Sequence, residues 1–340
     1  MNGKMTAAVL YGKEDVKIEK VPIPRVGGGE VLVKVHVALT CGTDLKVYQR
    51  GYHARMIVPP ALFGHELAGV VEEVGPGVRG FRKGMKVVAL NSAPCQKCFY
   101  CSKHQENLCE DLLFNNGAYA EYIRIPRRIV EQNMLVVPAS VTFEEAAMIE
   151  PLACVLRGLH ETKVEIGDTV TVIGGGPIGL MFVQVAKATG CNVISVVKRD
   201  SQVEAAKRMG AHDVVQITKT HDPIEAVRSL TPSKRGSDVV IEAVGRPQAW
   251  EWSIDMVRKG HRQLFRRMRQ WNQGPIGYDA AALFGNYAEG HVPPHARDRA
   301  KGFWTDGGEK SSIHRLYYRR GAALPLAAGI AAYAEPQRRH

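Results

Sequence analysis

The segment "DTVTVIGGGPIGLMFVQVAKATGCNVISVV", residues 168–197, constrains the fold more than any other part of this chain. An apolar run rich in β-branched residues leads into three glycines and a proline, then into a run with helical spacing, then into a second β-branched run. A strand, a tight turn, a helix and a second strand in this order make a βαβ unit. We therefore expect a doubly wound parallel sheet, and hence an α/β domain, in this part of the chain.

The glycines of this segment match the pattern G-x-G-x-x-G at Gly174, Gly176 and Gly179. We expect Gly174 to make the tight turn, Gly176 to let the backbone approach a pyrophosphate, and Gly179 to allow close packing of helix on strand. The helix that begins at Pro177 and Ile178 has an N-terminus suited to hold the anion. An ordinary β-turn is the alternative, but the position between strand and helix favours a dinucleotide site.

The end of the second strand predicts which dinucleotide binds. An acidic residue about 20 positions past the glycines would bind a ribose 2′-hydroxyl, but this chain has Val197, Lys198 and Arg199 there. Two cations without a carboxylate suit a 2′-phosphate, so we favour NADP over NAD. The alternative is that both cations lie on a solvated loop and Asp200 binds the ribose. Val244, after the apolar run "DVVIEA", is a further candidate cofactor contact.

Length and composition limit the classes of protein to which this chain can belong. The 340 residues suffice for two domains, and no apolar run is long enough to span a membrane. The start of the chain, "MNGKMTAAVLYGKEDV", lacks the apolar core and cleavage site of a secretory signal, so we expect a cytoplasmic protein. Clustered cysteines in that compartment bind metal more often than they form disulfides.

Residues 1–153 contain short β-type runs, among them "KMTAAVLYG", "EVLVKVHVAL" and "LAGVVEEVG", separated by turns rich in Gly and Pro. They predict a β-rich, barrel-like domain. Within it, "CQKCFYCSKHQENLC" places four cysteines so that four thiolates can close a tetrahedral shell around a structural zinc, with spacers of two, two and seven residues: Cys95, Cys98, Cys101 and Cys109. Disulfides and an iron-sulfur cluster are the alternatives, although the Cys-Pro ending of ferredoxin-type runs is absent.

A second set of metal-binding side chains is dispersed over the same domain. "TCGTD" supplies Cys41 and Thr43, "FGHELAG" supplies His65 and Glu66, and "MIEPLACV" supplies Glu150. Taken singly, each has an ordinary structural explanation as a small core residue, a satisfied polar group or a turn residue. Taken together, a thiolate, an imidazole and a carboxylate suit a zinc ion with an open coordination position, which can activate a substrate oxygen.

The motifs "CGTD", "FGHELAGVVEEVGPGV", the four-cysteine segment, "EPLACV" and "VTVIGGGPIGL" stand in the order and spacing of the zinc-dependent medium-chain dehydrogenases. The chain resembles this family over residues 5 to 260, and within it the polyol and threonine dehydrogenase branch. The resemblance implies a GroES-like catalytic domain at 1–153 and a Rossmann domain at 154–260, whose family equivalent continues to about residue 290. It also implies hydride transfer between a secondary alcohol or polyol and NAD(P), and a homodimer or homotetramer.

Carried over by motif, Cys41 and His65 resemble ligands of the catalytic zinc, and Glu66 and Glu150 resemble the two carboxylates that complete that shell or exchange within it. Which carboxylate ligates at rest stays open. Thr43 resembles the hydroxyl that passes the alcohol proton towards solvent; a threonine that caps a turn is the alternative. For Asp44 we expect a structural role.

Residues 261–340 do not continue this pattern. They carry a charge of +7 out of the total of +11, and "HRQLFRRMRQWN" stands where the family has an apolar strand. Our hypothesis is a shift of the reading frame near Gly260, which would leave the Rossmann sheet incomplete and the activity low. Reading the same nucleotides one position further on, Trp271 followed by Asn272 forces a glycine codon, and residues 286–296 can give the family-like "ITLKGTFHHTP".

Residues 261–340 could instead form a divergent folded ending or a basic arm for nucleic acid. Such an arm would have dense lysine runs and interleaved aromatic residues, which this segment lacks. We therefore expect neither nucleic acid nor membrane as partner, and the family resemblance implies a small-molecule alcohol or polyol. The alternative function is that of a catalytically impaired protein that binds zinc and nucleotide.

Overall fold

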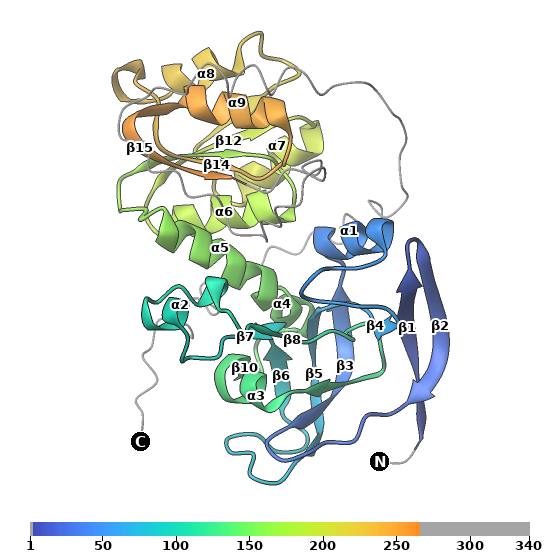
Figure 1. Cartoon of the computed structure of the whole chain (residues 1–340). Helices are drawn as coiled ribbons and strands as arrows, with labels where there is room; N and C mark the ends of the chain where they lie inside the picture. The colour runs from blue at the N-terminus through green and yellow to red at the C-terminus, as the bar shows by residue number, and fades with distance from the viewer. Residues whose placement is uncertain (1–2, 266–340) are drawn as a thin grey trace. The chain divides into compact units, whose positions relative to one another are not determined.

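The computed structural model describes residues 3–265, and the chain divides into two compact units after Cys154 (Figure 1). Over these residues, helices are too short or too polar to cross a membrane.

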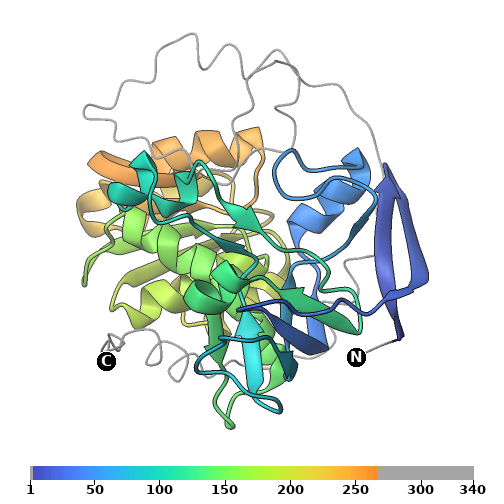
Figure 2. The same ribbon diagram turned by 60° about the horizontal axis from the view of Figure 1, so that its bottom comes forward.

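The first unit consists mainly of antiparallel strands. Its larger sheet has the order β10-β6-β5-β3-β9, and a smaller sheet has the order β2-β1-β4, in which β1 and β2 form the long dark blue hairpin of Figure 2. Its strands are β1 (Lys4–Gly12), β2 (Asp15–Pro22), β3 (Val31–Leu39), β4 (Ala61–Leu62), β5 (Glu66–Val74), β6 (Lys86–Ala89), β7 (Ser92–Ala93), β8 (Leu113–Phe114), β9 (Tyr122–Ile125) and β10 (Met134–Val136). Its helical segments are α1 (Gly42–Arg50), α2 (Phe99–Ser102), the 3-10 turn Glu106–Leu108, α3 (Arg127–Asn133) and α4 (Phe143–Ala147), and α5 (Ile149–Glu161) crosses the boundary.

The apolar core of the first unit anchors the segments around α1 and β5. Buried aliphatic residues of β3, β5, β6 and β9 form the main cluster, each fully buried side chain contributing about 1.5–3 kcal/mol. A smaller cluster joins Val47 of α1 to Leu10 of β1 and to Phe63, just before β5. The start of α1 and the start of β5 are therefore both anchored to the same apolar core.

The second unit is a parallel sheet with the order β13-β12-β11-β14-β15, which confirms the doubly wound α/β expectation. Its strands are β11 (Thr169–Ile173), β12 (Asn192–Val197), β13 (Asp213–Gln216), β14 (Ser237–Glu242) and β15 (Val257–Phe265). Its helical segments are α6 (Pro177–Ala188), α7 (Asp200–Arg208), α8 (Pro223–Ser229), the 3-10 turn Pro232–Lys234 and α9 (Pro247–Met256). Figure 1 shows α8 and α9 on one side of the sheet and α6 on the other.

The segment "QAWEWSIDMVRKG" is helical only in its first part. Helix α9 stops at Met256, and Val257 already begins β15, which pairs in parallel with β14. Two contacts favour the extended conformation: Val257 packs against the apolar cluster under α8 and α9, and Arg258 Nε donates to Asp238 Oδ1 at 2.6 Å. The strand continues to Phe265, past the proposed frame shift, whereas residues 266–340 lie outside the described part of the chain.

Candidate functional site

A thiol, an imidazole and a carboxyl group meet in the first unit. Cys41, His65 and Glu66 each offer a ligand atom, and these atoms lie within 4.8 Å of one another. Strand pairing explains the meeting, because Leu39 at the end of β3 lies opposite Glu66 at the start of β5. Cys41 then caps α1, and its Sγ accepts the Thr43 backbone N–H at 3.4 Å. The sequence prediction for these three side chains therefore corresponds to a real cluster.

Asp44 organises two members of this cluster. It is only 2% exposed, and its carboxylate accepts the Cys41 backbone N–H at 2.9 Å and lies 3.0 Å from His65 Nδ1. Since a carboxylate only accepts, Nδ1 carries a proton, and in the neutral imidazole that binds a metal the lone pair is then on Nε2. Burial lowers the pKa of His65, but hydrogen bonds and charge from Asp44 and Cys41 raise it to about 11. The surroundings thus favour positive charge at this point, as a bound cation would supply.

Glu66 has the properties of a ligand rather than of a structural carboxylate. Its side chain is 2% exposed, and within the described residues its Oε2 has no hydrogen-bond partner. Burial and the charge of Glu150 raise its pKa to about 7. A buried carboxylate oxygen without a donor is costly unless a cation neutralises it. The donor set of sulfur, nitrogen and oxygen suits zinc.

Glu150 lies in the first turn of α5, and its ligand atoms are not part of the group within 4.8 Å of one another. Burial raises the pKa of Glu150, and its charge acts on Glu66. The structure thus brings Glu66 together with Cys41 and His65, and leaves Glu150 nearby as a second carboxylate. Thr43 is half-buried in the first turn of α1.

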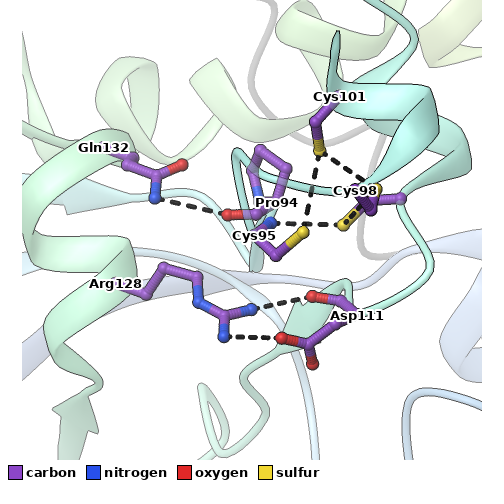
Figure 3. A network of polar contacts seen from close by, with 8 residues as sticks. Pro94, Cys95, Cys98, Cys101, Asp111, Arg128 and Gln132 are labelled. Atoms are coloured by element: carbon purple, nitrogen blue, oxygen red, sulfur yellow. Dashed lines mark hydrogen bonds and ion pairs between the residues drawn. The ribbon is translucent and has the colours of Figure 1, made fainter.

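The four cysteines of the second predicted site also come together (Figure 3). Three of their sulfur separations are 4.0 Å for Cys95 and Cys101, 3.5 Å for Cys98 and Cys101, and 3.9 Å for Cys98 and Cys109. Four sulfurs at about 2.3 Å from a central zinc would be about 3.8 Å apart. All four are free thiols, so the disulfide alternative is wrong. Backbone N–H groups of Cys101 and Glu110 lower the pKa of Cys98 to about 6, which favours a thiolate.

Helix α3 holds the four-cysteine segment at both ends, as Figure 3 shows. Gln132 Nε2 donates to the Pro94 carbonyl at 3.3 Å. Arg128 donates to Asp111 twice, to its carbonyl at 2.7 Å and its carboxylate at 2.8 Å. Both ends of the metal-binding segment are therefore tied to one rigid element.

The glycines of the second unit have the geometry expected of a nucleotide cradle. Gly174 has a φ of +119°, which only glycine adopts readily, and a Cβ on Gly179 would lie 1.9 Å from the Gly174 carbonyl oxygen. A Cβ on Gly176 would meet no atom of residues 3–265 within 4 Å. Gly176 is the N-cap of α6, with Pro177 at its first position and Ile178 next. A glycine with free space beside a helix N-terminus is suited to an approaching phosphate.

The residues after β12 differ from the pattern that binds a ribose hydroxyl. Val197 is buried, and Lys198 and Arg199 are exposed. The carboxylate of Asp200 is already bound by Lys219 Nζ at 2.7 Å and by Gln216 Nε2 at 3.1 Å. These bonds, both to Oδ1, lower the pKa of Asp200. Just after the neighbouring strand β14, Val244 lies against the first glycine, since a Cβ on Gly174 would be 2.9 Å from its Cγ2.

The chain matches two families of known domains. The alcohol dehydrogenase GroES-like domain covers residues 27–138, and the zinc-binding dehydrogenase domain covers residues 177–265. Sorbitol dehydrogenase of Bacillus subtilis is 34% identical over 279 residues, which are 80% of this chain and 77% of that protein. The chain belongs to the zinc-binding alcohol dehydrogenase family. It is therefore an oxidoreductase that transfers hydride between an alcohol and a nicotinamide cofactor.

Other members of the zinc-binding dehydrogenases support the same assignment. L-threonine 3-dehydrogenase of Bacillus licheniformis is 36% identical over 269 residues, covering 77% of this chain and 76% of that protein. The crystal structure of 2R,3R-butanediol dehydrogenase from Bacillus subtilis superimposes with a TM-score of 0.68 at 27% identity, covering 78% of this chain and 77% of that one. The predicted family and the GroES-like and Rossmann fold class are confirmed. The alternative of a catalytically impaired binding protein receives no support from these relatives.

Two contacts of the site go beyond what the sequence indicates. The structural role expected for Asp44 is a specific one, since it contacts both Cys41 and His65. Tyr119 reaches the same carboxylate from a distant part of the chain, with its hydroxyl 2.7 Å from Asp44 Oδ2. The "CGTD" motif itself is the available signal for Asp44, whereas nothing in the spacing of Tyr119 indicates its partner.

Proposed function

We propose that this zinc-binding dehydrogenase oxidises secondary alcohols or polyols with NADP, and that Cys41, His65 and Glu66 hold its catalytic zinc. The observation that carries the metal site is the buried, donor-free Oε2 of Glu66 beside a thiol and an imidazole. Glu150 is proposed as the carboxylate that exchanges with Glu66. The raised pKa values of both carboxyl groups fit two carboxylates that compete for one cation.

The zinc, when bound, supplies a Lewis acid that lowers the pKa of an alcohol oxygen. The protein supplies the remaining parts of the mechanism. Asp44 keeps the His65 proton on Nδ1 and fixes the direction of Nε2. The Thr43 hydroxyl, in the turn that follows Cys41, accepts the alcohol proton and passes it on towards solvent. The cofactor carries out the redox step, and the protein positions it.

The preference for NADP rests on charge after β12. A 2′-phosphate needs cations, and Lys198 and Arg199 are both exposed there. The competing acidic residue, Asp200, is occupied by Lys219 and Gln216. Gly174, Gly176, Gly179 and the α6 N-terminus at Pro177 and Ile178 would hold the pyrophosphate, and Val244 would contact the nucleotide beside Gly174.

The substrate class follows from the relatives. Sorbitol, threonine and 2,3-butanediol each present a secondary alcohol with a hydroxyl or amino group on a neighbouring carbon. We therefore propose substrates with this arrangement. The four cysteines hold a structural zinc, which supports the segment between β7 and β8 and takes no part in the chemistry.

The test is an assay of purified, zinc-loaded protein with NADP and NAD against a panel of polyols and diols and their primary-alcohol counterparts. We expect reduction of NADP, faster than reduction of NAD, by vicinal secondary alcohols. A folded, zinc-loaded protein that transfers no hydride to either cofactor would refute the proposal. Salt-sensitive DNA binding would instead favour a nucleic-acid function.

A further inference from the structure

Tyr119 is locked into the backbone around the candidate metal site. Its N–H donates to the Phe63 carbonyl at 2.9 Å, and its own carbonyl accepts the Ala8 N–H at 2.8 Å. These bonds tie it to β1 on one side and to the residues that precede His65 on the other. The backbone of Tyr119, from which its side chain extends, is therefore held in place by hydrogen bonds on both sides.

The hydroxyl of Tyr119 completes the hydrogen bonding of Asp44. It lies 2.7 Å from Asp44 Oδ2 and 3.0 Å from the Leu39 carbonyl, and the shorter contact is to the charged acceptor. Burial and the charge of Asp44 raise the pKa of Tyr119, so the hydroxyl keeps its proton and donates. Asp44 thus accepts from the Cys41 backbone, from His65 and from Tyr119.

The ring of Tyr119 acts on the residue before the imidazole. Gly64 has a φ of +85°, and a Cβ added there would lie 2.6 Å from Tyr119 Cγ. The ring also meets the Phe63 ring edge to face at 5.6 Å between centroids. The tyrosine therefore packs against the backbone from which His65 projects.

We propose that Tyr119 is a positioning residue of the catalytic metal site, which acts on Cys41 and His65 through Asp44 and on His65 through Gly64. The inference rests on the proposed role of Cys41 and His65 as zinc ligands. Loss of the hydroxyl would leave a carboxylate that is 2% exposed with one donor fewer. The carboxylate that orients both ligands would then be held less firmly. Hydrogen-bond partners of metal ligands typically contribute about 10-fold to 100-fold to metal affinity.

The test compares Tyr119→Phe with Tyr11→Phe. The control removes a bond of the same chemical type at the surface, in which the exposed Tyr11 hydroxyl donates to Glu19 at 2.9 Å. Zinc bound per chain is measured at a series of chelator-buffered zinc concentrations, so that the four-cysteine site and the Cys41 site give separate binding steps. Binding at the Cys41 site is also followed with Co²⁺ in place of zinc, by the visible absorption spectrum of the bound Co²⁺.

We expect Tyr119→Phe to weaken the step of the Cys41 site about tenfold and to change its Co²⁺ spectrum, with the four-cysteine step unchanged. Tyr11→Phe should match the unmodified protein in both. Unchanged or increased affinity with an unchanged spectrum in folded Tyr119→Phe would overturn the inference. Absence of the Cys41 step from the unmodified protein would overturn the metal-site proposal and this inference together.

Asp44→Asn separates positioning from general loss of structure. If Tyr119 acts through Asp44, Tyr119→Phe should weaken zinc binding much less in the Asp44→Asn background than in the unmodified protein. If the losses of zinc affinity caused by Tyr119→Phe and by Asp44→Asn simply added in the double variant, Tyr119 would not act through Asp44. If Tyr119→Phe does not fold, Asp44→Asn alone still decides, because unchanged zinc affinity in that folded variant would refute the role of Asp44 on which the inference depends.

Discussion

At the scale of residues, two acidic side chains in the same metal site have opposite surroundings. Asp44 accepts from three donors, whereas Glu66 Oε2 has none in the described part of the chain. A carboxylate rich in donors is satisfied without a metal, whereas a buried carboxyl oxygen without a donor is stabilised when a proton or a cation neutralises the group. This contrast supports the proposal that Asp44 positions the site and that Glu66 is a ligand, beyond what the residue types alone indicate.

Replacing both Lys198 and Arg199 by alanine should raise the KM for NADP about tenfold or more, because two charges that face the 2′-phosphate are lost. The KM for NAD should change little. Lys207→Ala, which removes an exposed cation of α7 away from the strand end, is the control. Steady-state kinetics with each cofactor measures both values. An equal loss for the two cofactors would show that these cations do not discriminate.

Two glycines of the cradle should respond differently to alanine. In Gly179→Ala the new Cβ would meet the Gly174 carbonyl at 1.9 Å, so we expect a fall in the free energy of unfolding of about 1–3 kcal/mol. Gly176→Ala meets no atom of the described residues within 4 Å and should keep its melting temperature, while the dissociation constant for NADP rises about tenfold. Thermal melts and fluorescence titration measure the two effects. Equal melting temperatures for both variants would contradict the packing argument.

At the scale of elements, α3 supports the four-cysteine segment, and we expect a bound zinc ion to support it as well. Its own helical pieces, α2 and one 3-10 turn, are too short to be stable alone. The tie from Arg128 to Asp111 is largely at the surface and is worth about 1 kcal/mol at most. A zinc ion bound by the four cysteines would therefore supply most of the order of this segment.

Cys98→Ser should lower the zinc content by one ion per chain and lower the melting temperature, because one of four thiolates is lost. Arg128→Ala should keep the zinc content and lower the melting temperature only slightly. Elemental analysis and calorimetry make the comparison. Undiminished zinc in Cys98→Ser would mean that the four cysteines hold no zinc.

Local motifs at this scale could be predicted from the sequence, and contacts between distant segments could not. The glycine turn at Gly174 and the four-cysteine segment depend on neighbouring residues, so spacing predicts them. The bond from Tyr119 to Asp44 and that from Lys219 to Asp200 join residues far apart in the chain. The end of α9 at Met256 could not be predicted either, since the pairing of Val257 with β14 decides it.

At the scale of the whole molecule, the two units contribute different chemistry. The first, ending at Cys154, contains both candidate metal sites, and the second contains the nucleotide cradle. The family match extends to residue 265, and β15 continues the sheet to the same point. The frame-shift hypothesis thus concerns residues whose backbone is described only as far as Phe265, and it stays a prediction.

The nucleotide sequence across the Lys259 codon tests the frame-shift hypothesis directly. We expect that reading one position further on gives an apolar strand in place of "HRQLFRRMRQWN" and a family-like sequence after it. A protein made with the restored frame should have a higher melting temperature, because it regains apolar residues that can be buried. A shifted reading that meets an early stop codon or matches no family segment would contradict the hypothesis.

The central claim is that Cys41, His65 and Glu66 hold a zinc ion that this dehydrogenase needs for hydride transfer. The most direct measurement determines zinc content and NADP-dependent alcohol oxidation together in the unmodified protein and in Cys41→Ser. The account predicts that the variant retains its fold, contains one zinc ion fewer per chain and oxidises alcohols about a thousandfold more slowly, equivalent to about 4 kcal/mol. A folded Cys41→Ser variant with undiminished zinc and an unchanged rate would contradict it.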